Sequence, residues 1–494
     1  MINRITDLSR FGLFLGLILF IVVLFLPAPD GLNETAWRTA AVAILMATWW
    51  ITEAIPIAAT SLIPIVMFPV LGISPIGDAT APYANPLIFL FMGGFIIAIG
   101  MQTWGLHKRI ALNIVNFIGV KPTSIIIGFI IASAFLSMWV SNTATALMML
   151  PIAVSVLHFV ETKNKSDEGT KTVTNFEIVL LLSIAYACNI GGIGTLIGTP
   201  PNALLAAFML ENYGLEISFA RWMMVGVPLV VLLLPLMYLL LSKFIFPIKM
   251  KELPGGKSII LNQLQGLGSI SKPELRVAVV FLGTAFLWIF RPLLSEVVPG
   301  LSDAGIAIAA GLALFLIPNG KKEGGSLLQW NNLRDLPWGI LILFGGGLSL
   351  ASAISSSGLA GWIGQGVSGL DALPTILLLF AVIIIIVFLT EITSNTATAA
   401  AFLPILASSA IGIGQNPMLF VIPAAIAASC AFMLPVATPP NAIIYGSGKV
   451  SIPQMAKAGI WLNIIVSVIL SIACYTYFAY VFGIEIGIIP DWVN

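Results

Sequence analysis

One polar tripeptide occurs twice in this 494-residue chain, each time within a long apolar stretch. Ser141-Asn142-Thr143 and Ser394-Asn395-Thr396 stand 253 residues apart, and Ala-Thr-Ala follows both of them. Their hydroxyls and carboxamides can donate to an anion, and their oxygens can bind a small hard cation such as Na⁺. A single Ser-Asn-Thr most often caps a helix, but its recurrence at matched positions favours a binding site.

A second polar motif is also duplicated. Thr199-Pro200-Pro201-Asn202 and Thr438-Pro439-Pro440-Asn441 stand 239 residues apart within apolar stretches. Because a proline pair removes two backbone donors, it interrupts a helix there, although a simple kink is the competing interpretation. A helix N-terminus after such a break suits a carboxylate, and the freed carbonyls before it suit Na⁺. The sequence thus predicts four interruptions at comparable depth.

The composition indicates an all-α polytopic membrane protein. Of the residues, 59% are hydrophobic and 9% are charged, against roughly 25% charged in a soluble protein. A net charge of +1 gives no basis for nucleic-acid binding. Two histidines and three scattered cysteines provide no disulfide framework, zinc site or assembled catalytic centre. We therefore expect a protein of the cell membrane that is not an enzyme and has no organic cofactor.

Charge in the loops predicts the topology. Lysine and arginine concentrate in short cytoplasmic loops, which places the N-terminus in the cytoplasm and the C-terminus outside. Each of two apolar segments, at 122–160 and at 371–410, has both of its flanks on the same side of the membrane. We predict that each is a re-entrant hairpin whose tip is buried in protein or lines an aqueous cavity, and that about 11 transmembrane helices complete the chain.

The repeats divide the chain into an N-terminal helix (1–36), a first repeat (37–247), a cytoplasmic linker (248–272) and a second repeat (273–494). Because one hairpin starts inside and the other outside, the repeats are predicted to be inverted. Inverted repeats with interrupted helices at the midplane are a transporter architecture. A passive channel is disfavoured, since closed tips from both sides suggest gates.

A few other residues have open interpretations. Glu391 lies deep in the second hairpin, where a packing or capping role competes with a role in ion coupling, because its repeat counterpart is Met138. Glu53 is interpreted as an interfacial or salt-bridged residue rather than a proton relay, and Trp49-Trp50 as an interfacial anchor. The apolar spacing of residues 108–119 predicts an amphipathic helix along the cytoplasmic surface.

Together, the twin Ser-Asn-Thr motifs and the two Thr-Pro-Pro-Asn-Ala breaks resemble the divalent anion/sodium symporter (DASS) family, the di- and tricarboxylate carriers of the ion transporter superfamily. The resemblance covers nearly the whole chain. It implies a homodimer in which a fixed scaffold domain holds the dimer contact and a transport domain with both hairpins moves as an elevator. A Na⁺/H⁺ antiporter is less consistent, because no acidic residue recurs at the two tips.

The resemblance also implies site residues and a cargo. One Na⁺ site comprises Ser137, Ser141, Asn142 and Gly198, and the other Thr390, Thr393, Asn395 and Ala437. The substrate would contact Ser141, Asn142, Thr143, Thr199, Ser394, Asn395, Thr396, Thr438 and Pro439. We expect secondary active symport of Na⁺ with a C4 dicarboxylate such as succinate, malate or fumarate. Na⁺-independent dicarboxylate exchange and carriage of citrate or sulfate are the alternatives.

Overall fold

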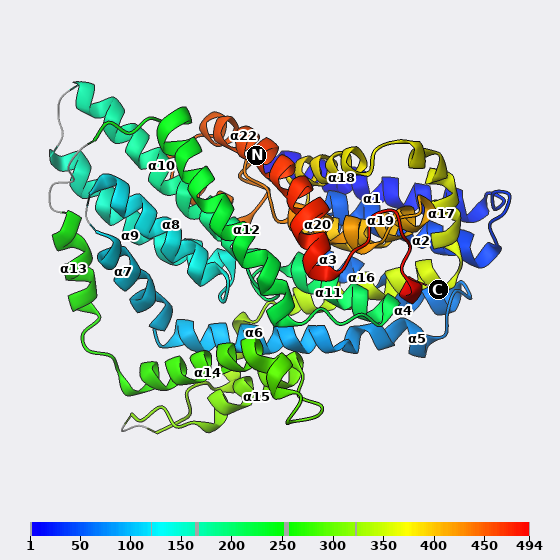
Figure 1. Ribbon diagram of the computed structural model, residues 1–494, viewed down its shortest axis with the longest axis horizontal. Helices are drawn as coiled ribbons and strands as arrows, with labels where there is room; N and C mark the ends of the chain where they lie inside the picture. The colour runs from blue at the N-terminus through cyan, green and yellow to red at the C-terminus, as the bar shows by residue number, and fades with distance from the viewer. Residues whose placement is uncertain (1, 120, 164–166, 251–255, 322–323, 494) are drawn as a thin grey trace.

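The chain folds almost entirely into α-helices (Figure 1). The computed structural model describes residues 2–119, 121–163, 167–250, 256–321 and 324–493. Within these ranges, the only β-structure is an isolated bridge between Pro318 and Ser326. The helices of the first half are α1 (Ile2–Phe25), α2 (Glu34–Thr52), α3 (Ile57–Thr60), α4 (Ile63–Val70), α5 (Ile76–Thr80), α6 (Pro86–Thr103), α7 (Leu106–Ile118), α8 (Pro122–Ser137), α9 (Asn142–Lys163), α10 (Asp167–Gly192), α11 (Pro200–Tyr213) and α12 (Phe219–Leu239).

The linker and the second half have the same character. They contain α13 (Gly256–Gly266), α14 (Lys272–Leu294), α15 (Asp303–Leu316), α16 (Trp338–Ser356), α17 (Leu359–Val367), α18 (Thr375–Thr390), α19 (Asn395–Gly412), α20 (Met418–Ala428), α21 (Pro439–Gly446), α22 (Ile452–Ala473) and α23 (Ala479–Phe482). Short 3₁₀ segments lie at 81–84, 330–335, 368–372 and 491–493, and π-helical turns extend α12 (240–245) and α22 (474–478).

The helices have the length and surface of membrane spans. In the described residues, seven helices are long and apolar enough to cross a bilayer, and seven shorter apolar helices accompany them. Large apolar side chains are exposed along α1, α12 and α14, where lipid would cover them. The prediction of an all-α polytopic membrane protein is confirmed. The count of eleven crossings and the side on which each terminus lies stay predictions, and the basic loops at 163–171, 243–257 and 321–334 fall partly outside the described residues.

The order of helices in the first half recurs in the second. The series α6 to α12 corresponds to α16 to α22, and both series end in a π-helical turn. The first hairpin helix packs on the interrupted helix of its own half, as α8 on α10 and α18 on α20. The second hairpin helix packs across the halves, as α9 on α21 and α11 on α19. These crossed contacts bring the duplicated motifs to one region.

Each hairpin consists of two helices joined by a short non-helical tip. Helices α8 and α18 have 16 residues each, which gives a length of about 24 Å. A bilayer core is about 30 Å thick, so neither helix spans it alone. The second helix of each hairpin contacts the first after the tip.

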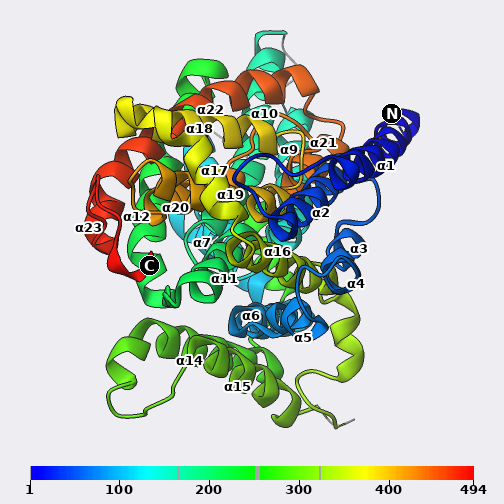
Figure 2. The same cartoon turned by 90° about the vertical axis from the view of Figure 1, so that its right-hand side faces the viewer.

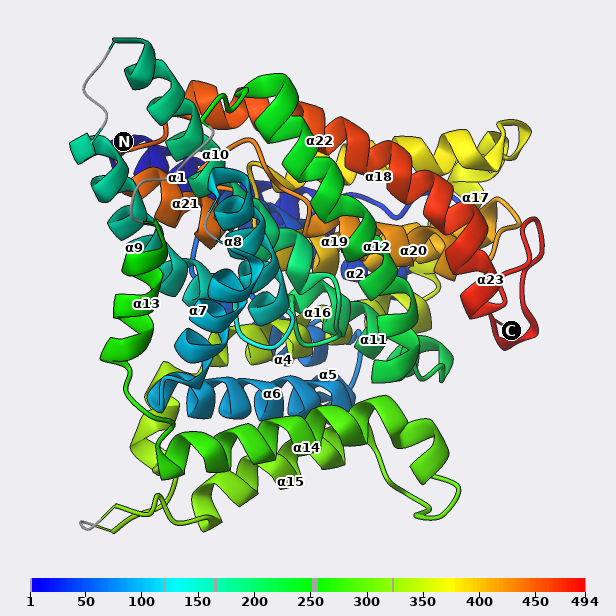
Figure 3. The same ribbon diagram turned by 60° about the vertical axis from the view of Figure 1, so that its left-hand side comes forward.

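Helices α14 and α15 lie along α6 at one edge of the molecule, and α18 and α22 lie at the opposite edge (Figures 1, 2 and 3). The two hairpins and the two interrupted helices therefore lie to one side of the α14–α15 pair.

Two side predictions have clear outcomes. The amphipathic helix exists as α7, which buries Leu106, Ala111, Leu112 and Val115 and packs on α8 and α13, while its place at the cytoplasmic surface stays a prediction. The anchor interpretation is wrong for Trp50, which is fully buried and donates its indole N–H to Ser61 Oγ at 3.2 Å.

Candidate functional site

A cavity of about 990 Å³ lies where the four predicted interruptions meet. We call the Ser-Asn-Thr segments at residues 141–143 and 394–396, which lead into α9 and α19, tip 1 and tip 2. Residues 193–199 and 429–438 separate the halves of the interrupted helices, and we call them break 1 and break 2. Both tips line the cavity, as do Gly198 and Thr199 of break 1 and Ala437 and Thr438 of break 2. The structure thus brings together motifs that are more than 200 residues apart in sequence.

Most of the predicted site residues line this cavity. They are Ser141, Asn142, Thr143, Gly198, Thr199, Ser394, Asn395, Thr396, Ala437, Thr438 and Pro439. The other three, Ser137, Thr390 and Thr393, are buried and do not line it. They are joined by hydrogen bonds to residues of their own hairpins. Since these three side chains do not line the cavity, any effect they have on a bound substrate is indirect, through the cavity wall.

Four helices begin at the cavity wall. Helix α9 starts at Asn142, α19 at Asn395, α11 at Pro200 and α21 at Pro439, and all four residues line the cavity. Each helix N-terminus carries roughly half a positive charge. Helices α9 and α19 also begin with backbone N–H groups, whereas the first two residues of α11 and α21 are prolines and have none. Their convergence makes the cavity suited to an anion with more than one negative group.

The formal charges near the cavity do not supply this attraction. Among the lining residues that the structure describes there is no lysine or arginine, and the ionisable ones are Glu53 and Asp335. A dianion in this cavity would be held by hydroxyls, carboxamides and helix N-termini. Co-bound cations would offset its remaining charge, which is a physical basis for coupling to Na⁺.

Oxygen atoms of Ser137, Cys188 and Gly198 surround the Asn142 carboxamide. Its oxygen faces Ser137 Oγ and the Cys188 and Gly198 carbonyls, all of which are acceptors or can be. Turning the amide places its nitrogen 3.3 Å from each of the two carbonyl oxygens. If the amide is not turned, a cation bound here could instead take these same oxygen atoms as its ligands. Ser137, Asn142 and Gly198 thus fit the donor set expected for Na⁺.

The second hairpin has a corresponding arrangement. Thr390 Oγ1 lies 2.7 Å from Asn395 Oδ1 and 2.9 Å from the Ala428 carbonyl oxygen. Thr390 and Asn395 occupy the positions of Ser137 and Asn142, 253 residues later. Thr393 instead bonds Leu389 O and Thr398 Oγ1, so it faces its own hairpin.

Each break is held open by an asparagine from the helix that follows it. Asn202 Nδ2 donates to the carbonyls of Gly192 at 3.2 Å and Thr195 at 2.8 Å. Asn441 Nδ2 donates to the carbonyls of Ala431 at 3.2 Å and Leu434 at 3.1 Å. The second set repeats the first at an offset of 239 residues. The proline pairs therefore mark true interruptions, which the asparagines stabilise by bonding carbonyls that have left the helix.

Glu391 fastens tip 2 to break 2. Its carboxylate accepts hydrogen bonds from the backbone N–H groups of Phe432, Met433 and Leu434 at 2.7 to 3.0 Å, and from Asn463 Nδ2 at 2.7 Å. It is buried and does not line the cavity. Of the two interpretations that the sequence left open, these contacts support capping. The counterpart Met138 has no carboxylate, and its carbonyl accepts instead from Thr195 Oγ1 at 2.5 Å.

Glu53 lies at the cavity wall, away from the two tips in sequence. It ends α2 with a left-handed backbone (φ 47°), is exposed, and lines the cavity. No ion pair involving Glu53 is found within the described ranges, so the salt-bridged interpretation has no support.

Two polar residues at or beside the cavity, one lining it and one buried next to a lining residue, were not found by sequence reasoning. Asn189 lines the cavity from the last turn of α10 and bonds across to break 2. Ser429 is buried at the start of break 2, with its hydroxyl 3.1 Å from that of Thr199. Neither belongs to a repeated motif. The available signal was an isolated amide and an isolated hydroxyl in otherwise apolar stretches.

The sequence of this chain is similar to known transporters over nearly its whole length. A family model described as the sodium:sulfate symporter transmembrane region matches residues 9–484. The sodium-dependent dicarboxylate transporter SdcS of Staphylococcus saprophyticus is 45% identical over 483 residues, covering 96% of this chain and 92% of that one. The protein of the same name from Staphylococcus aureus strain USA300 is 46% identical over 480 residues, with the same two coverages.

Solved structures share the fold at low identity. The YdaH transporter of Alcanivorax borkumensis has a TM-score of 0.54 at 12% identity, over 97% of this chain and 98% of that one. MtrF of Neisseria gonorrhoeae has a TM-score of 0.56 at 12% identity, over 95% and 94% of the two chains. These likenesses concern the arrangement of helices alone.

Proposed function

Because the chain belongs to the divalent anion/sodium symporter family, we propose that it is a Na⁺-coupled symporter that imports C4 dicarboxylates such as succinate, malate or fumarate. Members of this family are transporters and not enzymes. The relatives that are 45% and 46% identical are named sodium-dependent dicarboxylate transporters, which supports both the cargo and the coupling ion.

The observation that carries the proposal is the set of four helix N-termini at one cavity without a basic side chain among its described lining residues. A C4 dicarboxylate has two carboxylates a few ångströms apart. One would bind at tip 1 with Thr199, through Ser141, Asn142 and Thr143. The other would bind at tip 2 with Thr438 and Pro439, through Ser394, Asn395 and Thr396.

Na⁺ enters this scheme as a second cargo. The oxygens around Asn142 and those around Asn395 lie in the cavity wall, next to the tips that bind the anion. A cation at either place strengthens the field that attracts a dianion, and the dianion strengthens cation binding in return, since coupling between two ligands is reciprocal. Ser137, Ser141 and Gly198 complete the first proposed Na⁺ site, and Thr390, Thr393 and Ala437 complete the second.

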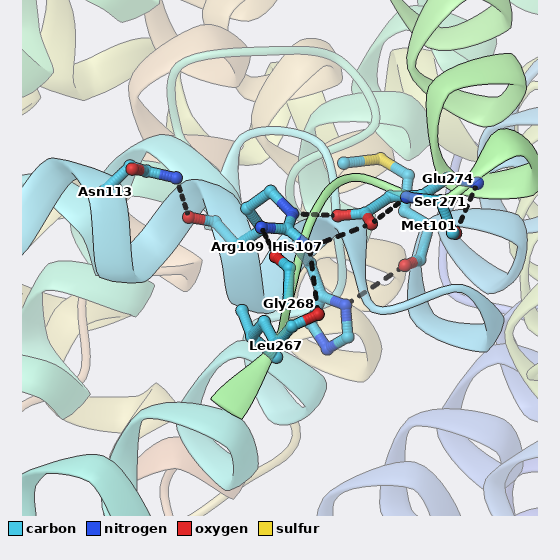
Figure 4. A network of polar contacts seen from close by, with 8 residues as sticks. All are labelled: Met101, His107, Arg109, Asn113, Leu267, Gly268, Ser271 and Glu274. Atoms are coloured by element: carbon cyan, nitrogen blue, oxygen red, sulfur yellow. Dashed lines mark hydrogen bonds and ion pairs between the residues drawn. The ribbon is translucent and has the colours of Figure 1, made fainter. Parts of the chain in front are cut away.

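The proposed transport mechanism is an elevator in a homodimer. Two helices that precede the hairpins, α7 and α17, serve as arms between the hairpins and the rest of the chain. Arm α7 is fastened to the start of α14 by an ion pair between the half-buried Arg109 and the buried Glu274 (Figure 4). Arg109 Nε lies 2.5 Å from Glu274 Oε1, and Arg109 Nη1 donates to the Gly268 carbonyl at 3.0 Å. An arm fixed at the α14 end allows the hairpins to move relative to α14 and α15, which belong to the proposed scaffold.

The test is uptake of radiolabelled succinate by the purified full chain in proteoliposomes. Symport predicts accumulation with an inward Na⁺ gradient and none when choline replaces Na⁺. Uptake that needs internal succinate and ignores Na⁺ would make the protein an exchanger and refute the coupling. Competition by unlabelled citrate or sulfate, stronger than by malate, would refute the C4 assignment.

Asparagines of the two tips provide the test of the site. We expect N142A and N395A each to abolish Na⁺-driven uptake while the protein remains folded in detergent. N212A is the matched control, because Asn212 bonds one carbonyl of its own helix, Phe208 O at 3.1 Å, and does not line the cavity. Full uptake by both tip variants would show that the site lies elsewhere.

A further inference from the structure

The two threonines that precede the proline pairs differ in their surroundings, although they occupy equivalent positions. Thr199 and Thr438 both line the cavity and both precede a helix. Thr438 Oγ1 is contacted by the side-chain nitrogen of Asn189 at 3.1 Å and by the backbone nitrogen of Asn441 at 3.3 Å. Among the residues that the structure describes, Thr199 Oγ1 has a single partner, Ser429 Oγ at 3.1 Å.

These contacts fix the direction of the Thr438 hydroxyl hydrogen. A threonine hydroxyl has one hydrogen to donate and two lone pairs to accept with. Both partners of Thr438 are N–H groups, which can only donate, so both lone pairs are used. No acceptor for its hydrogen is found in the part of the chain that the structure describes. Because Thr438 lines the cavity, this hydrogen is available to an anion bound there.

The orientation of Asn189 is itself determined. Its nitrogen also lies 3.2 Å from the Ala431 carbonyl oxygen, which can only accept. The nitrogen must therefore face break 2, and the amide cannot turn its oxygen toward Thr438. As a consequence Asn189 Oδ1 is buried without a partner among the described residues. A buried unpaired carbonyl costs stability, which an apolar side chain at this position would avoid.

Thr199 has no such constraint. Its partner is a hydroxyl, and either oxygen of the Thr199–Ser429 pair can be the donor. Thr199 can thus present a hydrogen or a lone pair to the cavity. The two halves of the cavity differ in this respect, although the tips are identical.

Building on the Na⁺-coupled dicarboxylate transport proposed above, we propose that Asn189 is a positioning residue for the substrate. It holds Thr438 as an obligatory donor to one carboxylate of the dicarboxylate. The Thr199 end accepts a wider range of groups, including a carboxylate or a substrate hydroxyl. Asn189 acts across the two halves, from α10 to the start of α21.

The test is a double-mutant cycle read by succinate uptake into proteoliposomes under a fixed Na⁺ gradient. N189A, T438V and the double variant are compared with the wild type, because the cycle isolates the coupling between the two residues. We expect N189A to raise KM about tenfold with saturating turnover within about twofold, as for a weakened hydrogen bond to a charged group. In the T438V background the same change should leave KM unaltered.

A second variant tests the inference without T438V. N189D preserves the side-chain volume but replaces the donating nitrogen by an accepting oxygen, which would draw the Thr438 hydrogen away from the cavity. Its KM should rise at least as much as that of N189A. S429A is the matched change beside Thr199. Because malate has a hydroxyl and succinate has none, S429A should alter the ratio of the KM for malate to the KM for succinate. N212A should match the wild type.

The results separate the two proposals. If the wild type takes up no succinate, the proposed function fails whatever the variants do. If the wild type transports, the Asn189 proposal is overturned by an equal effect of N189A in both backgrounds, by an unchanged KM in N189A, or by a wild-type KM in N189D.

Discussion

Glu391 gives the most demanding prediction about how the site is held together. Its carboxylate is buried between tip 2 and break 2, where three backbone N–H groups and Asn463 Nδ2 donate to it at 2.7 to 3.0 Å. The perturbation is E391Q, which preserves the shape but turns one oxygen into a donor. A neutral glutamine can accept at one oxygen only.

The cost follows from the geometry. The Leu434 N–H donates to Oε2 alone. Oε1 accepts from the Phe432 N–H and from Asn463 Nδ2, and both carboxylate oxygens accept from the Met433 N–H. If the amide nitrogen replaces Oε2, Leu434 N–H is left buried without an acceptor, at about 1–3 kcal/mol. The remaining bonds lose their charge assistance, and removal of a buried charge offsets part of that loss. We therefore expect a net loss of about 3 kcal/mol in the free energy of unfolding.

The assay is thermal unfolding of purified protein in detergent, followed by uptake. At about 2 °C per kcal/mol for a large chain, the midpoint should fall by about 6 °C. E296Q, a change at an exposed glutamate, should leave the midpoint unchanged. The fraction of E391Q that folds should keep Na⁺-dependent uptake, because the residue does not line the cavity. A wild-type midpoint together with lost Na⁺ dependence would refute the capping role and make Glu391 a coupling residue.

Three further predictions concern the packing and the arm. G459A should lower the unfolding midpoint by the equivalent of about 1–3 kcal/mol, because the added Cβ would stand 2.3 Å from the Phe432 carbonyl oxygen; a wild-type midpoint would contradict the close approach. E274A leaves the half-buried Arg109 guanidinium with backbone carbonyl partners only and should cost about 1.5–3 kcal/mol, measured in the same way, with partial recovery in R109M/E274M; no recovery would argue against the pair as the cause. Burial lowers the pKa of His107 below 6.5, so the unfolded chain binds a proton here more readily than the folded chain does. The free energy of unfolding should therefore fall as the pH drops below about 6.5 toward the folded pKa. H107Q should reduce the slope of the free energy of unfolding against pH, and an unchanged slope would exclude His107 as its source.

The sequence predicted the parts of the site that depend on repetition and on backbone chemistry. Two copies of Ser-Asn-Thr at a constant offset implied two equivalent tips, and the structure brings both to one cavity. Prolines lack an N–H, so the interruptions before α11 and α21 could be located without coordinates.

Contacts across long sequence separations could not be predicted in this way. The donors to Glu391 are mostly backbone amides 41 to 43 residues away, which carry no signature in the side-chain pattern. Asn189 meets Thr438 across 249 residues, and its role depends on which amide atom faces the threonine. Trp49 and Trp50 are neighbours in sequence, but on a helix they point about 100° apart, so one is buried while the other is half-buried.

The most direct measurement of the central claim is an experimental map of the purified protein in lipid nanodiscs with Na⁺ and succinate. We predict density for succinate in the cavity between residues 141–143 and 394–396, with one carboxylate within hydrogen-bonding distance of Thr438 Oγ1, and density for cations beside Asn142 and Asn395. Succinate bound away from both tripeptides, with the cavity holding only water, would contradict the account.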